Sequence, residues 1–326
     1  EEVNPLNKSG FGKFTFERLI QATLLDLVDR GHLSIFQGDE EPYLRIINEK
    51  GLSNFEKECL RMTLSNKKEL AISDLFPDYQ VSSGLYHGAK KSDEKHIRET
   101  GLHLKRSFER RLQRIQSCVK DKVHVLRIPS YYRPLTSEER RLALGMRVCS
   151  AITALGGLLF FYYSWQTHGF FSIPFLLLGL TGLVASFWVH FTMRGAYRDG
   201  VLTEEGAEIF YLWTSFENML RDIAHLDQAE LESIVLWNRL LVYATLFGYA
   251  KKVSKLMKVR HIQLENPDLN LYIAYGWHTQ FHASTAQIKQ YTAVANTASN
   301  YSVSSGSGSS GGGFSGGGGG GSIGAF

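Results

Sequence analysis

The sequence has little cysteine, and none of it is paired. Its 326 residues contain three cysteines, Cys59, Cys118 and Cys149, which stand far apart and form no Cys-x-x-Cys motif. A disulfide framework requires an even set of cysteines, and a zinc ribbon requires closely spaced pairs of cysteine or histidine. Both classes are therefore excluded.

The sequence also lacks common catalytic motifs. It contains no His-Glu-x-x-His motif, and no glycine-rich loop lies between a strand and a helix. The glycine run 316–321 has no strand before it and no helix after it, so we interpret it as low-complexity sequence and not as a phosphate-binding loop. Because no catalytic constellation emerges, we predict that the protein is not an enzyme and has no cofactor.

Charged residues are absent from two long apolar runs. Residues 148–165 and 170–193 contain no Asp, Glu, Lys or Arg, and only the four residues 166–169 separate them. A bilayer core of ~30 Å is spanned by about 20 apolar residues in a helix. The two runs, of 18 and 24 residues, therefore predict a two-helix transmembrane hairpin over 148–193.

Arginines flank the hairpin on both outer sides, whereas the connecting loop has neither Lys nor Arg. Loops rich in Lys and Arg stay on the cytoplasmic side of a membrane. We therefore predict a multi-pass protein of the cell membrane with both ends of this chain in the cytoplasm. The flanking residues are Arg140, Arg141, Arg147, Arg194 and Arg198.

The hairpin contains small residues and one ionisable group. His190 indicates either an interfacial histidine that reaches water near Arg194 or a proton or substrate pathway. The pathway requires a homo-oligomer, because two helices alone cannot enclose a pore. Small residues permit close helix packing, and we predict that they hold the two helices together. They are Gly156, Gly157, Gly182 and Ser186.

Residues 1–82 have the pattern of a winged-helix-like cytoplasmic unit. The apolar period predicts a helix over Phe14–Arg30, and alternating residues predict strands over Leu33–Phe36 and Tyr43–Ile47. This order resembles the last helix and the wing of a winged helix. Two further helices are predicted, one from Ser53, with Glu56 as its capping-box partner, to Leu64, and a shorter one from Ala71 to Phe76, stopped by Pro77.

The charge of this unit disfavours DNA as its ligand. Residues 1–82 contain 10 Lys+Arg and 14 Asp+Glu, a net charge of −4, and the predicted wing tip is Asp39–Glu41. Such a surface repels a phosphate backbone. We therefore predict a protein-interaction module with protein partners that the sequence does not identify.

Residues 83–147 are basic, with 16 Lys+Arg and 7 Asp+Glu, a net charge of +9. A helix over 92–118 and a strand over 123–128 predict a second, less regular winged-helix-like unit. Cations beside a transmembrane helix gain roughly 1 kcal/mol each near an anionic leaflet. We predict a patch that faces anionic lipid headgroups, with a solvated helix face as the alternative; nucleic acid is not favoured. The patch comprises Lys105, Arg106, Arg110, Arg111, Arg114, Arg140, Arg141 and Arg147.

The part after the hairpin predicts a helical domain over 194–262, a linker with an aromatic segment over 263–301 and a disordered Gly/Ser-rich tail over 302–326. His278 and His282 are four residues apart, a spacing that places both on one helix face as candidate metal ligands. The sequence marks no third ligand.

Four strings occur in an order that resembles one family: 22–35 (ATLLDLVDRGHLSI), 202–208 (LTEEGAE), 240–248 (LLVYATLFG) and the terminal 324–326 (GAF). They resemble the bacterial predicted membrane proteins of domain-of-unknown-function family 2207. The resemblance implies a signal sequence, an extracytoplasmic β-rich domain and a further transmembrane helix upstream, so we expect this chain to be the C-terminal part of a longer protein. The family brings no established activity and no catalytic residues.

We thus expect an α+β membrane protein with winged-helix-like cytoplasmic units, a two-helix transmembrane hairpin, a small helical domain and a disordered Gly/Ser tail. The function that we favour is a bacterial membrane-anchored, non-enzymatic adaptor or signalling scaffold. One alternative is a membrane-tethered regulator that binds nucleic acid through the basic segment. The other is an oligomeric transport component that uses His190.

Overall fold

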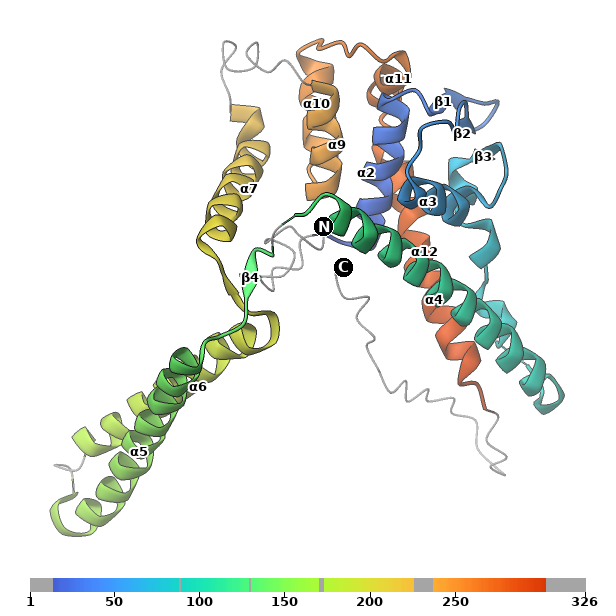
Figure 1. The fold of residues 1–326 in the computed structure, drawn as a ribbon. Coiled ribbons are helices and arrows are strands. Elements are labelled where there is room, and N and C mark those ends of the chain that lie inside the picture. The colour runs from blue at the N-terminus through green and yellow to red at the C-terminus, as the bar shows by residue number, and fades with distance from the viewer. Residues whose placement is uncertain (1–13, 88, 129, 170–172, 226–236, 303–326) are drawn as a thin grey trace. The chain divides into compact units, whose positions relative to one another are not determined.

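The structure is a computed structural model, and it describes residues 14–302 apart from 88, 129, 170–172 and 226–236. The described chain is an α+β protein, mostly helical with two small sheets (Figure 1). The helices are α2 (Phe16–Asp29), α3 (Asn54–Leu64), α4 (Glu94–Val125), α5 (Ser137–His168), α6 (Ile173–Asp199), α7 (Glu204–Asp222), α9 (Trp237–Phe247), α10 (Ala250–Val259), α11 (Pro267–Tyr275) and α12 (His278–Ser299). The strands are β1 (Leu33–Gln37), β2 (Pro42–Ile46), β3 (Glu69–Ala71), β4 (Tyr132–Arg133) and β5 (Val201–Leu202).

Contacts divide the described chain into two units. The hairpin unit, Pro129–Trp213, contains β4, α5, α6, β5 and the first half of α7. The globular unit is built from Lys13–Ile128 together with Thr214–Phe326, in their described parts. The hairpin unit is therefore inserted into the sequence of the globular unit.

Helix α2 forms the centre of the globular unit. Its N-terminus is capped by Thr15, whose side chain accepts a hydrogen bond from the amide of Arg18. Ten of its fourteen residues are buried, on more than one side, and α9, α12, α3, β1 and α11 pack around it (Figure 1). A helix that is buried on most of its sides is a core helix and not a surface helix.

The predicted strand ribbon is confirmed directly after α2. Strands β1 and β2 pair antiparallel with Phe36 opposite Tyr43. The outer edge of β1 is covered by α11, because the Ile35 amide donates to the Asp268 carboxylate over 3.1 Å. An edge strand that is covered in this way is closed to strand addition.

The predicted helix from Ala71 is wrong. Strand β3 pairs antiparallel with β2, placing Leu70 opposite Leu44, and single 3-10 turns follow over Ile72–Asp74 and Pro77–Tyr79. The free edge of β2 offers backbone hydrogen bonds that this short segment fills, which local apolar spacing does not reveal. By contrast, α3 begins as expected, with the capping box of Ser53 and Glu56 present.

Two further predictions about secondary structure are wrong. The strand predicted over 123–128 is absent, because α4 continues to Val125. Val125 is 78% exposed and belongs to neither of the two sheets. The segment 263–301, which we predicted to be a linker, contains the helices α11 and α12, and both have buried residues in the core. Tyr272 of α11 and Phe281 of α12 are buried edge to face, 5.9 Å between ring centroids.

The helical domain predicted over 194–262 is not a separate unit. Helices α9 and α10 belong to the globular unit, and α9 packs along α2. Gly248, which has a φ of +87°, lies between the end of α9 and the start of α10. The tail from 303 onward lies outside the described residues.

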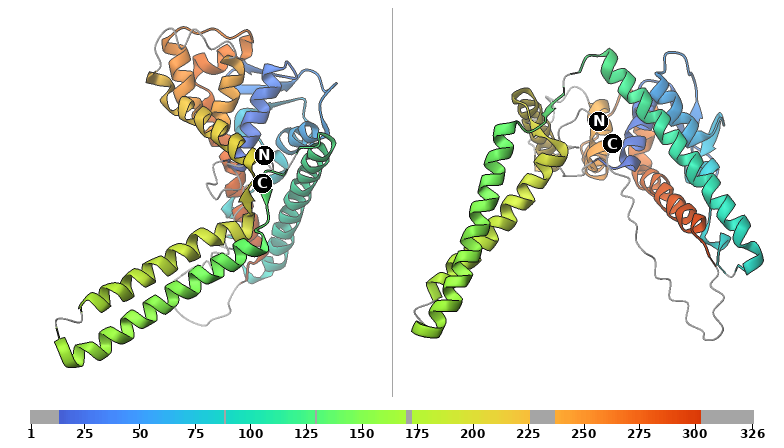
Figure 2. Two further views of the ribbon diagram at one scale, coloured as in Figure 1. Left: turned by 60° about the vertical axis from the view of Figure 1, so that its left-hand side comes forward. Right: turned by 60° about the horizontal axis from the view of Figure 1, so that its bottom comes forward.

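The hairpin unit consists of two apolar helices packed antiparallel and side by side (Figures 1 and 2). Both are long and apolar enough to cross a membrane, over Ser137–Gln166 and Ile173–Arg194. Only 17% and 11% of their most apolar windows is buried, whereas the core helix of a soluble protein would be mostly buried. Exposed apolar surface on this scale indicates a hydrocarbon environment.

Candidate membrane anchor and interaction surfaces

Glycines bring the backbones of α5 and α6 into contact. A β-carbon on Gly182 would lie 2.5 Å from the amide nitrogen of Ala154, and one on Gly179 would lie 3.0 Å from that of Leu158. Gly157 packs against Gly179 in the same way. Of the predicted packing residues, Gly157 and Gly182 therefore lie in the interface.

The other predicted hairpin residues lie elsewhere. Gly156 has nothing within 4 Å of where its β-carbon would be, so it is not an interface glycine. Ser186 is half-buried on α6, and His190 is exposed. Gly179 was missed by the sequence interpretation, although Gly179 and Gly182 are both small residues on the helix that faces Gly157.

A short clasp joins the two ends of the hairpin, and we define it as residues 131–133 with 200–206. Strands β4 and β5 pair antiparallel, and the Thr203 amide donates to the Tyr131 carbonyl over 2.9 Å. The Thr203 hydroxyl accepts from the Gly206 amide over 3.0 Å and so caps the N-terminus of α7. A β-carbon on Gly206 would lie 2.4 Å from the Tyr131 carbonyl oxygen. The string 202–208 is thus one half of the clasp.

The predicted cations at the start of α5 have different environments. Arg140 and Arg141 are exposed. Arg147 is half-buried, with its guanidinium 5.4 Å from the ring centroid of Tyr197 on α6, so it packs inside the base of the hairpin. Arg133, which sequence reasoning did not single out, makes a bidentate ion pair with Glu139 over 2.7 and 2.8 Å.

On α4, one predicted cation is part of the fold. Arg111 donates to Glu58 of α3 over 2.7 Å, and Arg61 reaches the other oxygen of the same carboxylate over 2.8 Å. Burial raises the pKa of Glu58, but the hydrogen bonds from Arg111 and Arg61 outweigh burial, and the net pKa lies below its ordinary value. Arg111 therefore joins α4 to α3.

The other cations on α4 point away from this contact. Arg106, Arg110 and Arg114 are exposed and follow one another at four-residue spacing, which places them on one face of the helix. Lys105 is half-buried and lies off this face. Three of the five predicted α4 cations thus form one exposed row, which we call the arginine row.

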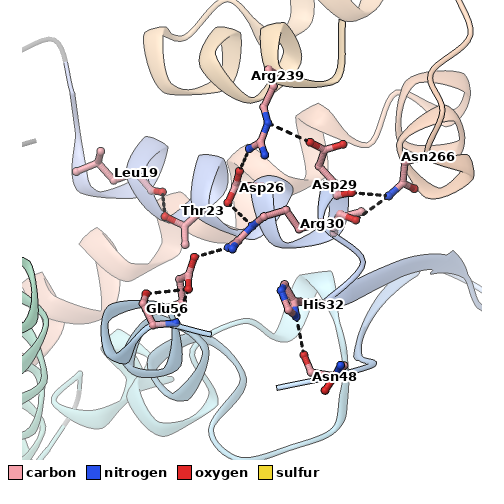
Figure 3. Close-up of polar contacts among 12 residues, drawn as sticks. Leu19, Thr23, Asp26, Asp29, Arg30, His32, Asn48, Glu56, Arg239 and Asn266 are labelled. Carbon is pink, nitrogen blue, oxygen red and sulfur yellow. Dashed lines mark hydrogen bonds and ion pairs between the residues drawn. The ribbon is translucent and has the colours of Figure 1, made fainter. Parts of the chain in front are cut away.

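The charges of α2 are paired within the globular unit (Figure 3). Arg239 of α9 contacts the carboxylates of both Asp26 and Asp29, and Arg30 contacts Asp26 over 2.9 Å. Arg30 also pairs with Glu56 of α3. These ion pairs join α2 to α9 and α3, so the charged side chains of α2 are not available to bind a ligand.

The start of α2 is fixed in the same way. Arg18 donates to the Phe247 carbonyl at the end of α9 over 3.4 Å, and its guanidinium lies against Gly248. The buried Glu17 pairs with Lys289 of α12 over 3.0 Å. The strings 22–35 and 240–248 lie largely in α2 and α9, and these two helices pack together.

The wing is the antiparallel pair of strands β1 and β2 with the turn between them, residues 33–46. Phe36 and Tyr43 stack 5.8 Å apart between centroids, and the Arg45 guanidinium lies 4.4 Å from the centroid of Phe36. Asp39 and Glu40 at the tip are exposed. Aromatic and arginine side chains that meet beside a charged rim are typical of protein interfaces.

The two candidate metal ligands lie in the first turns of α12. His278 is half-buried and His282 is exposed. Burial lowers the pKa of His278, and the charge of Lys251 lowers it further. Among the described residues, no group of three or more His, Cys, Asp or Glu side chains is placed to hold a metal ion. The structure thus brings no third ligand from the described residues to this pair.

The comparisons bear on the hairpin and on the strings that the clasp and the α2–α9 interface contain. No curated protein and no solved structure matches the chain. The sequence model of one family, described as "Predicted membrane protein (DUF2207) C-terminal domain", matches residues 3–257. The match includes both apolar helices, the clasp and α2 with α9, and it confirms the resemblance that the sequence indicates. The chain therefore belongs to the DUF2207 family of predicted membrane proteins, and it contains the family's C-terminal domain.

Proposed function

We propose that this membrane protein is a non-enzymatic adaptor or scaffold, which holds a protein-binding globular unit at the cytoplasmic face of the bacterial cell membrane. The arginines that flank the hairpin support cytoplasmic ends for the described chain. The observation that carries the proposal is the contrast between α2 and the wing. The helix is enclosed and its charges are paired, whereas the tip of the wing, at Gln37, Asp39 and Glu40, is exposed.

The enclosed α2 also bears on the nucleic-acid alternative. A recognition helix reads DNA by entering the major groove with its side chains free. In a winged-helix-like reading of this unit, α2 is the helix before the wing, and its sides are covered by α9, α12 and α3. The winged-helix-like element then serves as a folding core, and its wing is left for binding proteins.

The chemistry of the wing indicates the kind of partner. Phe36 and Tyr43 offer half-buried aromatic anchors beside Arg45, which is paired with Glu69, and the tip beside them is acidic. We propose a protein partner that buries the Phe36–Tyr43 stack and places basic side chains against Asp39 and Glu40.

Site-specific photocrosslinking in native membranes tests this proposal. A photoreactive amino acid replaces Gln37 in the wing of the full-length chain, and in a control it replaces Asn300, which is exposed beyond α12. We expect a discrete protein adduct at position 37 that weakens when Asp39→Lys and Glu40→Lys are added. Equal adducts at both positions, or none at position 37, would contradict the proposal.

A further inference from the structure

The arginine row on α4 has no internal task in the part of the chain that the structure describes. Arg110 donates one hydrogen bond to the backbone carbonyl of Arg106, and Arg106, Arg110 and Arg114 make no ion pair with a described acidic side chain. Their neighbour Arg111, one residue further round the helix, is paired with Glu58. On α4, Arg111 is therefore part of the fold, whereas the three arginines of the row make no ion pair within the described part of the chain.

The row is held on a rigid support. On its other side α4 packs against α12, where a β-carbon on Gly101 would lie 2.4 Å from the Ser299 amide nitrogen. The contact of Arg111 with Glu58 fixes the same helix against α3. Because the backbone of α4 is held at these two places, the three guanidinium groups are presented together at intervals of about 6 Å along the axis.

The composition of the row points to an anionic, repeating partner. From His103 to Ser117 its helix face contains His103, Arg106, Arg110, Gln113, Arg114 and Ser117, and no carboxylate. Only the eleven residues 126–136 separate the end of α4 from the start of α5, the first candidate membrane span. A short tether raises the local concentration of the surface to which it is attached. Phospholipid headgroups are therefore the most concentrated anions available to this face.

We propose that Arg106, Arg110 and Arg114 dock the globular unit onto anionic phospholipid headgroups of the membrane that the hairpin spans. The inference rests on the proposed anchorage and adds a second, peripheral membrane contact to it. Arg111 is not part of this contact, because it is paired with Glu58 of α3. Three cations near an anionic surface strengthen binding by about five-fold each, or about a hundred-fold together.

The test uses the full-length chain in nanodiscs. A fluorophore is attached at Gln113→Cys, an exposed position next to Arg114, in a background with Cys118→Ser and Cys149→Ser. Discs contain phosphatidylcholine alone or with about one third phosphatidylglycerol, and a nitroxide on the lipid headgroup quenches any fluorophore that approaches it. We expect strong quenching in the anionic discs only. It should fall as the salt rises from about 0.1 M to about 1 M, because the screening length drops from about 10 Å to about 3 Å.

A matched pair of triple variants isolates the row. Arg106→Glu, Arg110→Glu and Arg114→Glu together should abolish the quenching. Lys50→Glu, Lys67→Glu and Lys68→Glu change the same charge at exposed positions outside α4 and should leave it unchanged. The neutral triple variant Arg106→Gln, Arg110→Gln and Arg114→Gln removes the three charges without reversing them. It is the control in case the charge reversal unfolds α4, and circular dichroism measures the helix content of each variant. The neutral variant should also lose most of the quenching.

Several outcomes would overturn the inference. One is equal quenching in neutral and anionic discs, and another is quenching that survives in both arginine variants. Loss of the quenching in anionic discs when duplex DNA is added at physiological salt would replace the lipid with nucleic acid. The two experiments are independent. Loss of the wing crosslinks would contradict the proposed protein partner and not the lipid contact, and loss of the quenching would contradict the lipid contact and not the protein partner. If the chain inserted into no nanodisc of either composition, both proposals would be contradicted, because both require the hairpin to span the membrane.

Discussion

A β-carbon on Gly157 of α5 would lie 2.4 Å from the backbone nitrogen of Gly179 of α6. The two helices of the hairpin are therefore in backbone contact at this point, with no room for a methyl group. Lipid tails are as apolar as leucine side chains, so such helices associate through close packing and not through a hydrophobic driving force.

Gly157→Ala should weaken the hairpin by roughly 1–3 kcal/mol, because the methyl group forces α5 and α6 apart. Gly156→Ala is the matched control on the adjacent residue, where the β-carbon meets nothing. It should be neutral or slightly stabilising, since alanine is the better helix former. Unfolding of the purified chain in detergent measures both, and equal losses at the two positions would contradict the interface.

Gly248→Ala should destabilise the globular unit more than Gly31→Ala. Both glycines have positive φ, +87° and +72°, so each alanine costs about 1–2 kcal/mol of backbone strain. At Gly248 the β-carbon would also lie 2.6 Å from the Arg18 guanidinium carbon, whereas at Gly31 it meets nothing. The difference between the two melting temperatures reports the Arg18 contact, and identical shifts would show that strain alone matters.

The Glu58 carboxylate should make stability depend on acid. Its pKa is lowered in the folded state from an ordinary value of 4.5, so its contribution is fully present above that value and is lost as the pH falls through the folded value. Glu58→Gln should cost about 1–3 kcal/mol at pH 7 and flatten the stability curve below about pH 4.5.

Glu69→Gln is the control for Glu58, because its pair with Arg45 is 41–48% exposed. An exposed pair contributes less than about 1 kcal/mol. Thermal unfolding between neutral and acidic pH distinguishes the two. A pH profile of Glu58→Gln that matches the unmodified chain would refute the role of this carboxylate.

The globular unit should fold only when both of its segments are present. A chain of residues 14–128 joined through a flexible linker to 214–302 should be soluble and unfold cooperatively. A fragment that ends near Tyr132 should not, because α9 and α12, which cover α2, follow the hairpin in the sequence. Circular dichroism during heating tests both chains, and a sharp transition of the shorter fragment would contradict this view of the core.

Local sequence signals predicted the elements that depend on local physics. The charge-free runs predicted the hairpin helices, and the Ser53–Glu56 capping box predicted the start of α3. The β1–β2 ribbon was predictable from alternation around a polar turn. Each of these elements is determined by residues within a few positions of one another.

The wrong predictions concern segments whose structure is determined by residues that are distant in the sequence. Strand β3 exists because β2 has a free edge, and the 263–301 segment is helical because Tyr272 and Phe281 are buried against each other. The clasp could not be predicted, because its strands of two residues carry no periodic signal. Among the basic residues, composition could not separate Arg111, which binds Glu58, from Arg110 beside it, which makes no ion pair with the described residues.

The insertion of the hairpin unit into the globular unit sets an order of events during translation. The ribosome completes α2, β1–β3, α3 and α4 before the hairpin, and α9 to α12 after it. Until those last helices emerge, the sides of α2 that α9, α11 and α12 cover stay open to chaperones and proteases. The apolar helices are synthesised within that interval, so the domain closes only after the membrane segment has left the ribosome. A completely folded globular unit can therefore exist only in a chain whose hairpin has already been synthesised.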